Sequence, residues 1–187
     1  MIQVKDVVKS FDGNVVLDHI SADFEDGKVN MIIGQSGSGK TVLMKSMIGL
    51  HQIDEGEIVF DTRNGQQNLA GMTEKEVRML HREVGMLFQG AALFDSMTVQ
   101  ENVLFPLEMF SQMDKEEMVE RARFCLTRVN MPERAFGLMP SEISGGMQKR
   151  VAIARAIALN PRYLFCDEPN SGLDPKTSLV IDQLIQD

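Results

Sequence analysis

The sequence Gly34-Gln35-Ser36-Gly37-Ser38-Gly39-Lys40-Thr41 fits the pattern G-x-x-x-x-G-K-[ST] at each fixed position. It follows an apolar run over residues 29–33, which we expect to form a strand, and precedes residues 42–48, which predict the first turns of a helix. This strand-to-helix context makes the pattern typical of a loop that holds a phosphate chain. The alternative, an ordinary Gly/Ser turn, gives no reason for the ending Gly-Lys-Thr.

Each residue type in this loop has a chemical reason. The glycines allow the chain to curl so that several backbone N–H groups converge on phosphate oxygens. The helix that follows adds its N-terminal amides and the positive end of its dipole. Lys40 can reach the β- and γ-phosphates, and the Thr41 hydroxyl is placed to ligate Mg²⁺. The predicted nucleotide contacts are Gly34, Ser36, Gly37, Ser38, Gly39, Lys40, Thr41 and Val42.

Composition favours a soluble globular protein. The 187 residues are 43% hydrophobic and 25% charged, which suffices for one sizeable core. With 19 basic and 27 acidic residues the net charge is −8, which argues against a general nucleic-acid binder. No apolar run reaches the roughly 18 residues of a membrane span, and the N-terminus has no signal-peptide pattern. We therefore expect a cytosolic protein that reaches a membrane only through a partner.

The first 30 residues alternate apolar and polar side chains, with turns at residues 12–14 and 25–27, which predicts an antiparallel β lobe. A strand at residues 57–61 should rejoin this lobe, and Asn64-Gly65 is a strong turn signal. Phe11 stands just before the first turn. It could stack on an adenine ring, or it could be an ordinary surface or core phenylalanine.

Residues 91–160 have a helical composition. A capping box of Thr98 with Glu101 begins one helix, and Asp114 opens another. A third helix begins near Gly146, and its basic side chains are expected to face outward: Lys149, Arg150 and Arg155.

Two apolar segments end in polar residues that suit phosphate chemistry. Residues 84–88 form a buried strand that ends in Gln89, and residues 163–166 predict a strand of a parallel sheet that ends in Asp167 and Glu168. Asp167 can hold Mg²⁺, usually through water, and Glu168 can act as general base on an attacking water. The alternative is an acid pair that is simply exposed to solvent at a strand end.

A second glycine-rich helix start lies at Ser144-Gly145-Gly146, which gives a second potential anion site. One chain with one nucleotide seldom needs two such sites. Head-to-tail pairing of two copies would explain both, with Ser144 and Gly146 of one copy contacting the γ-phosphate held by the other. Taken alone, the segment could equally be a helix cap with a flexible glycine pair.

Together these residues resemble the ATP-binding-cassette (ABC) ATPase family over essentially the whole chain. The resemblance implies an α/β P-loop NTPase fold with a RecA-like parallel sheet core, an N-terminal antiparallel β lobe and an inserted helical subdomain. It implies a single domain over 1–187, with core and β lobe at about 1–90 and 161–187 and the helical subdomain at about 91–160. ATP and Mg²⁺ are the implied cofactors.

The resemblance also assigns the motifs: Walker A at 34–41, the Q-loop at Gln89, the signature at 143–147, Walker B at 163–167 and the D-loop at 171–174. It implies catalytic roles for Glu168, Gln89 and Lys40, and Mg²⁺ contacts from Thr41, Gln89 and Asp167. Phe11 takes the place of the adenine-stacking aromatic. The residues implied to act in trans across a dimer are Ser144, Gly145, Gly146 and Asp174.

The chain departs from the family pattern at two points. Ile143 and Met147 replace the commoner Leu and Gln of the signature, which leaves residues 144–146 in place. Family members continue past the D-loop helix to another strand and a switch histidine, whereas the histidines here lie far upstream: His19, His51 and His81. We therefore expect a truncated chain that lacks the switch-histidine region, which leaves turnover by this chain alone open.

A narrower resemblance lies in residues 87–99, 101–107 and 138–142 and in the Ser-Gly-Gly-Met signature, which look like the MlaF-type ATPase subunits of Mla/Mce phospholipid transporters. It implies transport of phospholipid or another hydrophobic substrate, integral membrane permease partners, an Mce-type lipid-binding subunit, a homodimer on nucleotide binding, and a place on the cytoplasmic face of the inner membrane. The apolar residues after Gln89 would contact the permease, or each could be helical core: Leu93, Phe94, Met97, Val99 and Phe105.

Other classes of protein are alternatives to the phospholipid-transporter ATPase. An importer ATPase for amino acids or other small solutes shares every motif except residues 90–99 and Met147, and a nucleotide-binding fragment without turnover is a further alternative. A chromosome-maintenance ATPase would carry a long coiled coil between Gln89 and the signature. A translation-factor type would carry two cassettes and basic regions.

Overall fold

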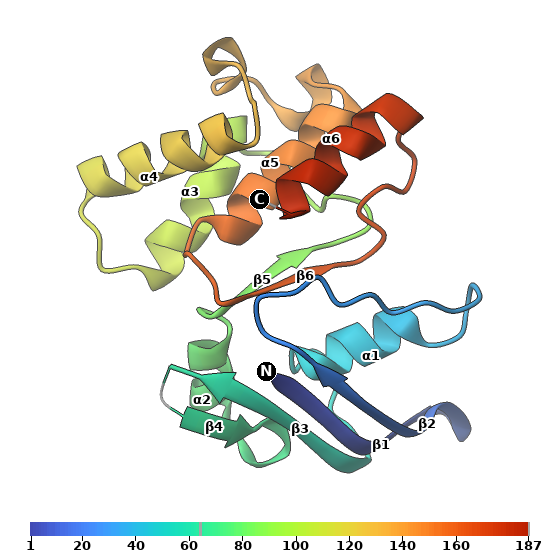
Figure 1. Ribbon diagram of the computed structural model, residues 1–187. Helices are drawn as coiled ribbons and strands as arrows, with labels where there is room; N and C mark the ends of the chain where they lie inside the picture. The colour runs from blue at the N-terminus through green and yellow to red at the C-terminus, as the bar shows by residue number, and fades with distance from the viewer. Residues whose placement is uncertain (64, 187) are drawn as a thin grey trace. The chain divides into compact units, whose positions relative to one another are not determined.

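A computed structural model describes residues 1–63 and 65–186 of the chain. They form two compact units, Met1–His81 and the residues from Arg82 onward. Figure 1 colours the first unit from blue to green and the second from green to red. Within the described part of the chain, no helix has both the length and the apolar character needed to cross a membrane.

The first unit is built on a four-stranded antiparallel sheet in the order β2-β1-β3-β4 (Figure 1). Val4 of β1 lies opposite both Ala22 and Ile58, and the apolar side chains of Val4, Ile58 and Phe60 are buried. This confirms the predicted β lobe. Its elements are β1 (Ile2–Phe11), β2 (Asn14–Phe24), α1 (Lys40–Met47), β3 (Glu55–Thr62), β4 (Gly65–Asn68), η1 (Leu69–Gly71) and α2 (Glu74–Leu80). The turn expected at Asn64-Gly65 includes Asn64, which lies outside the described residues.

The strand expected at residues 29–33 does not form. No described strand pairs with this segment, and the side chains of Val29, Met31 and Ile33 are 65%, 76% and 84% exposed. Apolar composition favours an extended chain, but a strand also needs a neighbour that accepts and donates its backbone hydrogen bonds. The sequence of residues 29–33 predicts an extended chain, but it does not specify a neighbouring strand with which to pair.

The second unit holds a parallel pair of strands, β5 (Val84–Leu87) and β6 (Tyr163–Cys166). Leu87 lies opposite Cys166, so both strands end at the same edge. A Cβ at Gly85 would lie 2.4 Å from the carbonyl oxygen of Ala156 in α5. The close approach of β5 to this helix therefore requires a glycine at position 85. The other elements are α3 (Val99–Phe110), α4 (Lys115–Arg128), η2 (Glu133–Ala135), η3 (Pro140–Glu142), α5 (Gly145–Ile157) and α6 (Pro175–Gln186).

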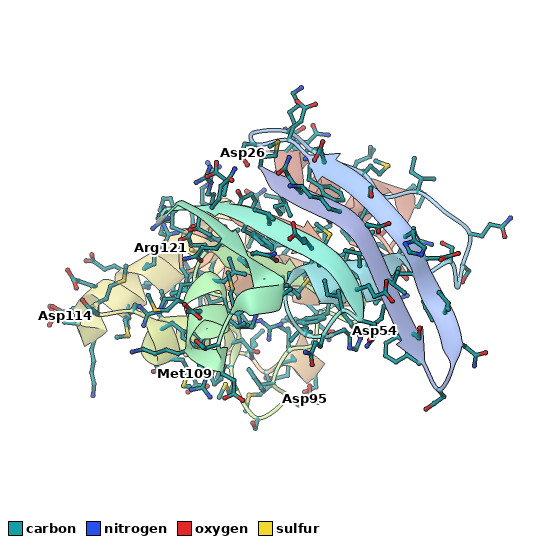
Figure 2. The ribbon with its side chains drawn as sticks, turned by 90° about the horizontal axis from the view of Figure 1, so that it is seen from below. Asp26, Asp54, Asp95, Met109, Asp114 and Arg121 are labelled. Carbon is teal, nitrogen blue, oxygen red and sulfur yellow. The ribbon has the colours of Figure 1, made fainter. Side chains whose placement is uncertain are left out.

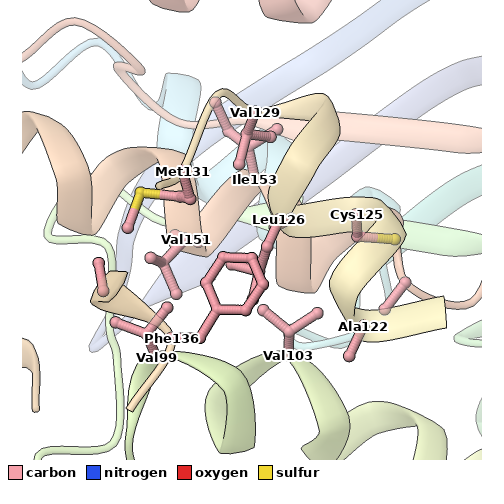
Figure 3. Close-up of a cluster of buried hydrophobic side chains, with 14 of the residues drawn as sticks. Val99, Val103, Ala122, Cys125, Leu126, Val129, Met131, Phe136, Val151 and Ile153 are labelled. Carbon is pink, nitrogen blue, oxygen red and sulfur yellow. The ribbon is translucent and has the colours of Figure 1, made fainter. Parts of the chain in front are cut away.

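Helices α3, α4 and α5 enclose the main apolar core of this unit (Figure 3). The Phe136 ring lies among side chains from all three helices, with Val103, Leu126 and Val151 fully buried around it. Val99 is also fully buried, so for this residue the core alternative is right and a permease contact is wrong. Arg121 of α4, labelled in Figure 2, donates to the Ala158 and Ile157 carbonyls at the end of α5 and so fastens the two helices together.

Residues 90–98 form a loop, so within the segment of helical composition that was expected from about residue 91 the first helix begins only after the Thr98 cap. Ala91 and Ala92 have φ values of 63° and 48°, in the left-handed region that interrupts a helix. The Arg155 guanidinium donates to both of their carbonyls, at 2.8 and 2.7 Å, so Arg155 is half-buried and does not simply face outward. The side chains that fix this loop come from α3 and α5, far away in sequence.

Asn102 of α3 is the other side chain that holds the loop, and it is fully buried. Its Oδ1 accepts from the Phe94 N–H at 2.8 Å, and its Nδ2 donates to the Phe94 and Met97 carbonyls at 3.1 Å each. An amide thus replaces the water that these backbone groups would otherwise bind. Residues 90–98 have a fixed conformation because their backbone polar groups form hydrogen bonds with the side chains of Asn102 and Arg155.

Asn102→Ala should lower the free energy of unfolding by about 2–3 kcal/mol, because it leaves buried donors and acceptors of the loop unpaired. Urea unfolding followed by circular dichroism measures this change. The control is Glu108→Ala on the exposed face of the same helix, which should change stability by less than about 0.5 kcal/mol. Equal effects of the two substitutions would contradict the role assigned to Asn102.

The predicted capping box at the start of α3 is confirmed. Thr98 donates its backbone N–H and its hydroxyl to Glu101 Oε2, at 2.7 and 2.8 Å, and these bonds hold the pKa of Glu101 below its ordinary value of 4.5. A lowered folded-state pKa means that the carboxylate stabilises the fold above the ordinary value and loses this effect as the pH falls through the folded value.

Glu101→Gln should therefore destabilise the protein at pH 7, and the difference from wild type should shrink as the pH falls below 4.5. Urea unfolding at a series of pH values measures both curves, with Glu108→Gln on the same helix as a charge-matched control. A difference between wild type and Glu101→Gln that stays constant with pH would show that the carboxylate charge plays no part in the cap.

Candidate functional site

The glycine-rich loop ends in a helix start that has no side-chain cap. Gly39 is the N-cap of α1 with φ 90°, and a Cβ at this position would lie 3.0 Å from the Val16 carbonyl oxygen. Neither the conformation nor the space admits another residue. Helices α2, α3, α4 and α5 are capped by side chains, whereas the first amides of α1 receive none from their N-cap. This helix start suits an anion.

Lys40 folds back over the loop that precedes it. Its Nζ donates to the Gly34 and Gln35 carbonyls at 2.9 and 2.7 Å, and the Ser38 N–H closes a turn onto the same Gln35 carbonyl at 3.2 Å. A Cβ at Gly34 would lie 2.7 Å from Ser38 Oγ, so a side chain there would fill the curl. The loop forms a small cradle of backbone with a positive charge at its rim.

The remaining predicted contacts of the nucleotide lie in the same unit. Ser36 and Gly37 are exposed in the loop, and Thr41 and Val42 are half-buried in the first turn of α1. Their positions next to Lys40 fit a phosphate chain and its metal ion.

Phe11 ends β1 with its ring 39% exposed. The His51 ring meets it edge-on, with centroids 5.4 Å apart, and Lys9 Nζ lies 5.3 Å from its centroid. Lys9 also forms an ion pair with Asp54, labelled in Figure 2, at 2.7 Å. The ring is therefore supported from the side and partly open to a ligand, and its stacking on adenine stays a prediction.

In the second unit the ends of β5 and β6 bring three predicted residues together. The Asp167 N–H donates to the Leu87 carbonyl at 2.9 Å, which continues the strand pairing by one residue. Gln89 Nε2 donates to Glu168 Oε2 at 2.7 Å and lies 3.4 Å from Ser171 Oγ. Asp167 is buried beside this pair. Gln89, Asp167 and Glu168 therefore lie together at one edge of the β5–β6 pair.

Lys149 of α5 lies against the same residues, although its side chain was expected to face outward. It is only 5% exposed, and its Nζ donates to the Gln89 carbonyl and, at 3.5 Å, to the Glu168 carbonyl. Burial holds the pKa of Lys149 below its ordinary value, and the neighbouring carboxylates of Asp167 and Glu168 offset only part of this shift. The outward prediction is wrong because it followed the charge of the residue instead of its position on the helix.

The starts of helices α5 and α6 lie close together. Ser144 caps α5 by accepting the Met147 N–H at 3.3 Å, and a Cβ at Gly146 would lie 2.6 Å from Thr177 Cγ2. The Thr177 N–H in turn donates to the Asp174 carboxylate, which caps α6. Gly145 stands between them and is exposed. The four residues predicted to act in trans therefore share one region of the second unit.

The residues present fit a nucleotide with a bound magnesium ion. Mg²⁺ in such sites takes one or two protein oxygens and completes its shell with phosphate oxygens and water. Over residues 1–63 and 65–186, no group of three or more His, Cys, Asp and Glu side chains could hold a metal ion. The predicted magnesium contacts are Thr41 in the first unit and Gln89 and Asp167 in the second, and each unit is described by itself.

Comparison with known proteins decides the family. The family model described as ABC transporter matches residues 17–171. The chain belongs to the ABC transporter family. This membership and the match to solved ATP-binding cassettes confirm the predicted fold class and are consistent with ATP and Mg²⁺ as cofactors.

The relatives and the solved structures match essentially all of this chain. The chain is 41% identical over 187 residues to a methionine import ATP-binding protein MetN of Clostridium tetani, covering 100% of this chain and 57% of that protein. It is 37% identical to the probable ribonucleotide transport ATP-binding protein mkl of Mycobacterium leprae, covering 52% of that protein. The chain thus spans about half the length of these relatives.

Among solved structures, the chain resembles the ATP-binding cassette MJ0796 in a dimeric post-hydrolysis state bound to ADP and phosphate. The TM-score is 0.89 and the identity 33%, covering 99% of this chain and 81% of that one. A fold match at this level supports the α/β cassette architecture that the resemblance implied.

Three residues of the cassette escaped the sequence interpretation: Asn102, Lys149 and Arg155. For Lys149 a signal existed, because it lies three and four residues before the buried Ala152 and Ile153 and so shares their helix face. For Asn102 and Arg155 the partners are backbone groups of a loop whose conformation the sequence does not reveal.

Proposed function

We propose that the full-length protein is the ATP-hydrolysing subunit of a membrane transporter. The hydrogen bond of 2.7 Å between Gln89 and Glu168 carries this proposal, because it joins the residue proposed to sense the γ-phosphate to the proposed general base. A pure nucleotide-binding scaffold would have no use for a carboxylate held there.

The proposed roles follow from the contacts of each residue. Lys40 would turn from the Gly34 and Gln35 carbonyls toward the phosphates, exchanging neutral acceptors for charged ones. Thr41, Gln89 and Asp167 would hold Mg²⁺, which supplies charge neutralisation on the phosphate oxygens. Glu168 would accept a proton from the attacking water while Gln89 keeps its carboxylate oriented.

Pairing of two cassettes is part of the proposal. Ser144, Gly145, Gly146 and Asp174 of one copy would face the phosphates held by the other, since α5 and α6 present these residues at neighbouring helix starts. Hydrolysis would remove the bridging phosphate and reopen the pair, because a ligand shifts an equilibrium only through its different affinities for the two states. The dimeric state reported for MJ0796 supports this arrangement.

For the cargo we propose phospholipid or another hydrophobic substrate, carried by a permease with an Mce-type lipid-binding subunit. The support is residues 87–99 and the Ser-Gly-Gly-Met signature. The permease would contact the helical subdomain, about residues 91–160, through Leu93, Phe94, Met97 and Phe105, and the cassette would lie on the cytoplasmic face of the inner membrane. Phe94, 40% exposed, lies on the fixed loop with its ring 4.7 Å from that of Phe105.

A second candidate is import of a small solute such as an amino acid. The observation that favours it is the 41% identity to a protein named as a methionine import subunit. ATPase subunits do not touch the cargo, so their sequence reports it only by analogy.

One purification from native membranes tests these proposals. The full-length Glu168→Gln protein with Mg-ATP should retain its permease, and mass spectrometry should find bound phospholipid. A permease with a soluble solute-binding protein and no specific lipid would favour small-solute import. Recovery of no membrane protein would contradict the transport proposal itself.

A further inference from the structure

Lys149 is a charged group in a place where charge is costly. Its ammonium is almost fully withdrawn from water in α5, and a buried charge destabilises a fold unless it is well paired. The ammonium donates to the main-chain carbonyls of Gln89 and Glu168, and the nearby carboxylates of Asp167 and Glu168 favour its charge. These interactions place a buried charge next to the two proposed reacting residues.

The two carbonyls belong to the two residues whose side chains bond to each other. Gln89 and Glu168 lie on segments that follow different strands, and their side chains meet at 2.7 Å. Lys149 joins the same two residues through their backbones. The side-chain hydrogen bond and the two bonds of the ammonium form a closed ring of contacts between Gln89, Glu168 and Lys149. A shift of either Gln89 or Glu168 would therefore break a charge-assisted hydrogen bond.

The backbone of Glu168 also needs support. Its φ of 46° lies in the left-handed region, which is unfavourable for a residue with a side chain. In this conformation its carbonyl accepts both Lys149 Nζ at 3.5 Å and the Ser171 N–H at 3.0 Å. Two donors on one carbonyl hold the peptide in an orientation that a free chain would seldom adopt.

We propose that Lys149 is a positioning residue for hydrolysis: its buried ammonium fixes the backbones of Gln89 and Glu168 so that the Glu168 carboxylate points correctly. This inference rests on the proposed function of that pair and adds a residue outside the sequence motifs. It also links two parts of the cassette, since Ser144 caps the same helix about 7 Å away along its axis. A shift of α5 would reach Gln89 and Glu168 through Lys149.

Lys149→Met in the full-length protein is the main test. Methionine keeps the apolar stem and removes the charge, and such exchanges of buried charges are often neutral for stability. We expect kcat for ATP to fall about 10- to 100-fold. KM should change by less than about threefold, because most of the proposed phosphate contacts come from residues 34–41 and Lys149→Met leaves the Gln89 side chain itself in place. Lys149→Arg, which retains charge and donors, should restore a substantial part of kcat.

Arg150→Met is the matched control. It removes the same charge from the next residue of α5, whose guanidinium donates to the Asn130 carbonyl and not to Gln89 or Glu168. We expect its kcat to stay within about twofold of wild type. An unchanged kcat in Lys149→Met, or an equal fall of kcat in both variants, would overturn the proposal.

Hydrogen exchange separates this inference from the proposed function. Without nucleotide, amides of residues 88–92 and 163–173 should exchange faster in Lys149→Met than in wild type or Arg150→Met, because the bonds from Lys149 to the Gln89 and Glu168 carbonyls are lost. If the wild type hydrolyses no ATP, the proposed function fails, and the hydrogen-exchange comparison alone then decides whether Lys149 fixes the two backbones. Equal exchange rates in all three proteins would refute the proposed role of Lys149, even if Lys149→Met were inactive through misfolding elsewhere.

Discussion

Glu168→Gln in the full-length protein should reduce ATP turnover by about 10²- to 10⁴-fold, the usual contribution of a general base. The amide cannot accept a proton from water, yet its oxygen can still accept the bond that Gln89 Nε2 makes at 2.7 Å. The local geometry should therefore survive. Nucleotide affinity should be retained, and the ATP-bound dimer should accumulate because the step that reopens it is blocked.

Steady-state phosphate release and size-exclusion chromatography with Mg-ATP measure both effects. Glu120→Gln is the control, since it makes the same chemical change on the exposed face of α4 and should leave turnover unaltered. Wild-type turnover in Glu168→Gln would remove Glu168 as the base. Loss of nucleotide binding in that variant would instead indicate a damaged site.

Lys40→Ala should weaken the binding of ATP and ADP by at least about 100-fold, because it deletes a charged donor to phosphate oxygens. It also removes the two bonds by which the ammonium holds the Gly34 and Gln35 carbonyls. The loop should therefore lose order before any ligand arrives. The variant is expected to fail at binding, in contrast to Glu168→Gln, which fails at turnover.

Isothermal titration with ADP measures the affinity, and the melting temperature reports whether the fold is intact. Lys45→Ala, at the other end of α1, tests whether any lost positive charge on this helix has the same effect. An affinity in Lys40→Ala close to that of wild type would refute the assignment of residues 34–41 as the phosphate site.

Local signals in the sequence were sufficient wherever neighbours in the chain decide the structure. The capping box of Thr98 with Glu101 fixes the start of α3 within four residues, and alternation in β1 and β2 needs only a turn to pair the two strands. The two strands that end at Gln89 and at Asp167 were also found from their apolar runs, whereas their parallel pairing, which brings Gln89 to Glu168, is seen only in the structure.

Prediction failed where distant groups decide. Residues 29–33 have the composition of a strand, but pairing depends on a neighbour that the segment itself does not specify. The loop at residues 90–98 takes its shape from Asn102 and Arg155, which its own residues do not reveal. Lys149 is buried because backbone carbonyls from two other segments receive it.

The loop held by Asn102 and Arg155 has a consequence for any protein that docks on it. Its backbone is already ordered in the free chain by bonds to Phe94 and to Ala91 and Ala92. A docking protein would then meet a rigid surface and lose little conformational entropy there, a loss that otherwise reaches about 0.5–1.5 kcal/mol for each side chain immobilised. Contact with this loop should therefore form in one step, without the slow rearrangement that a flexible segment would add.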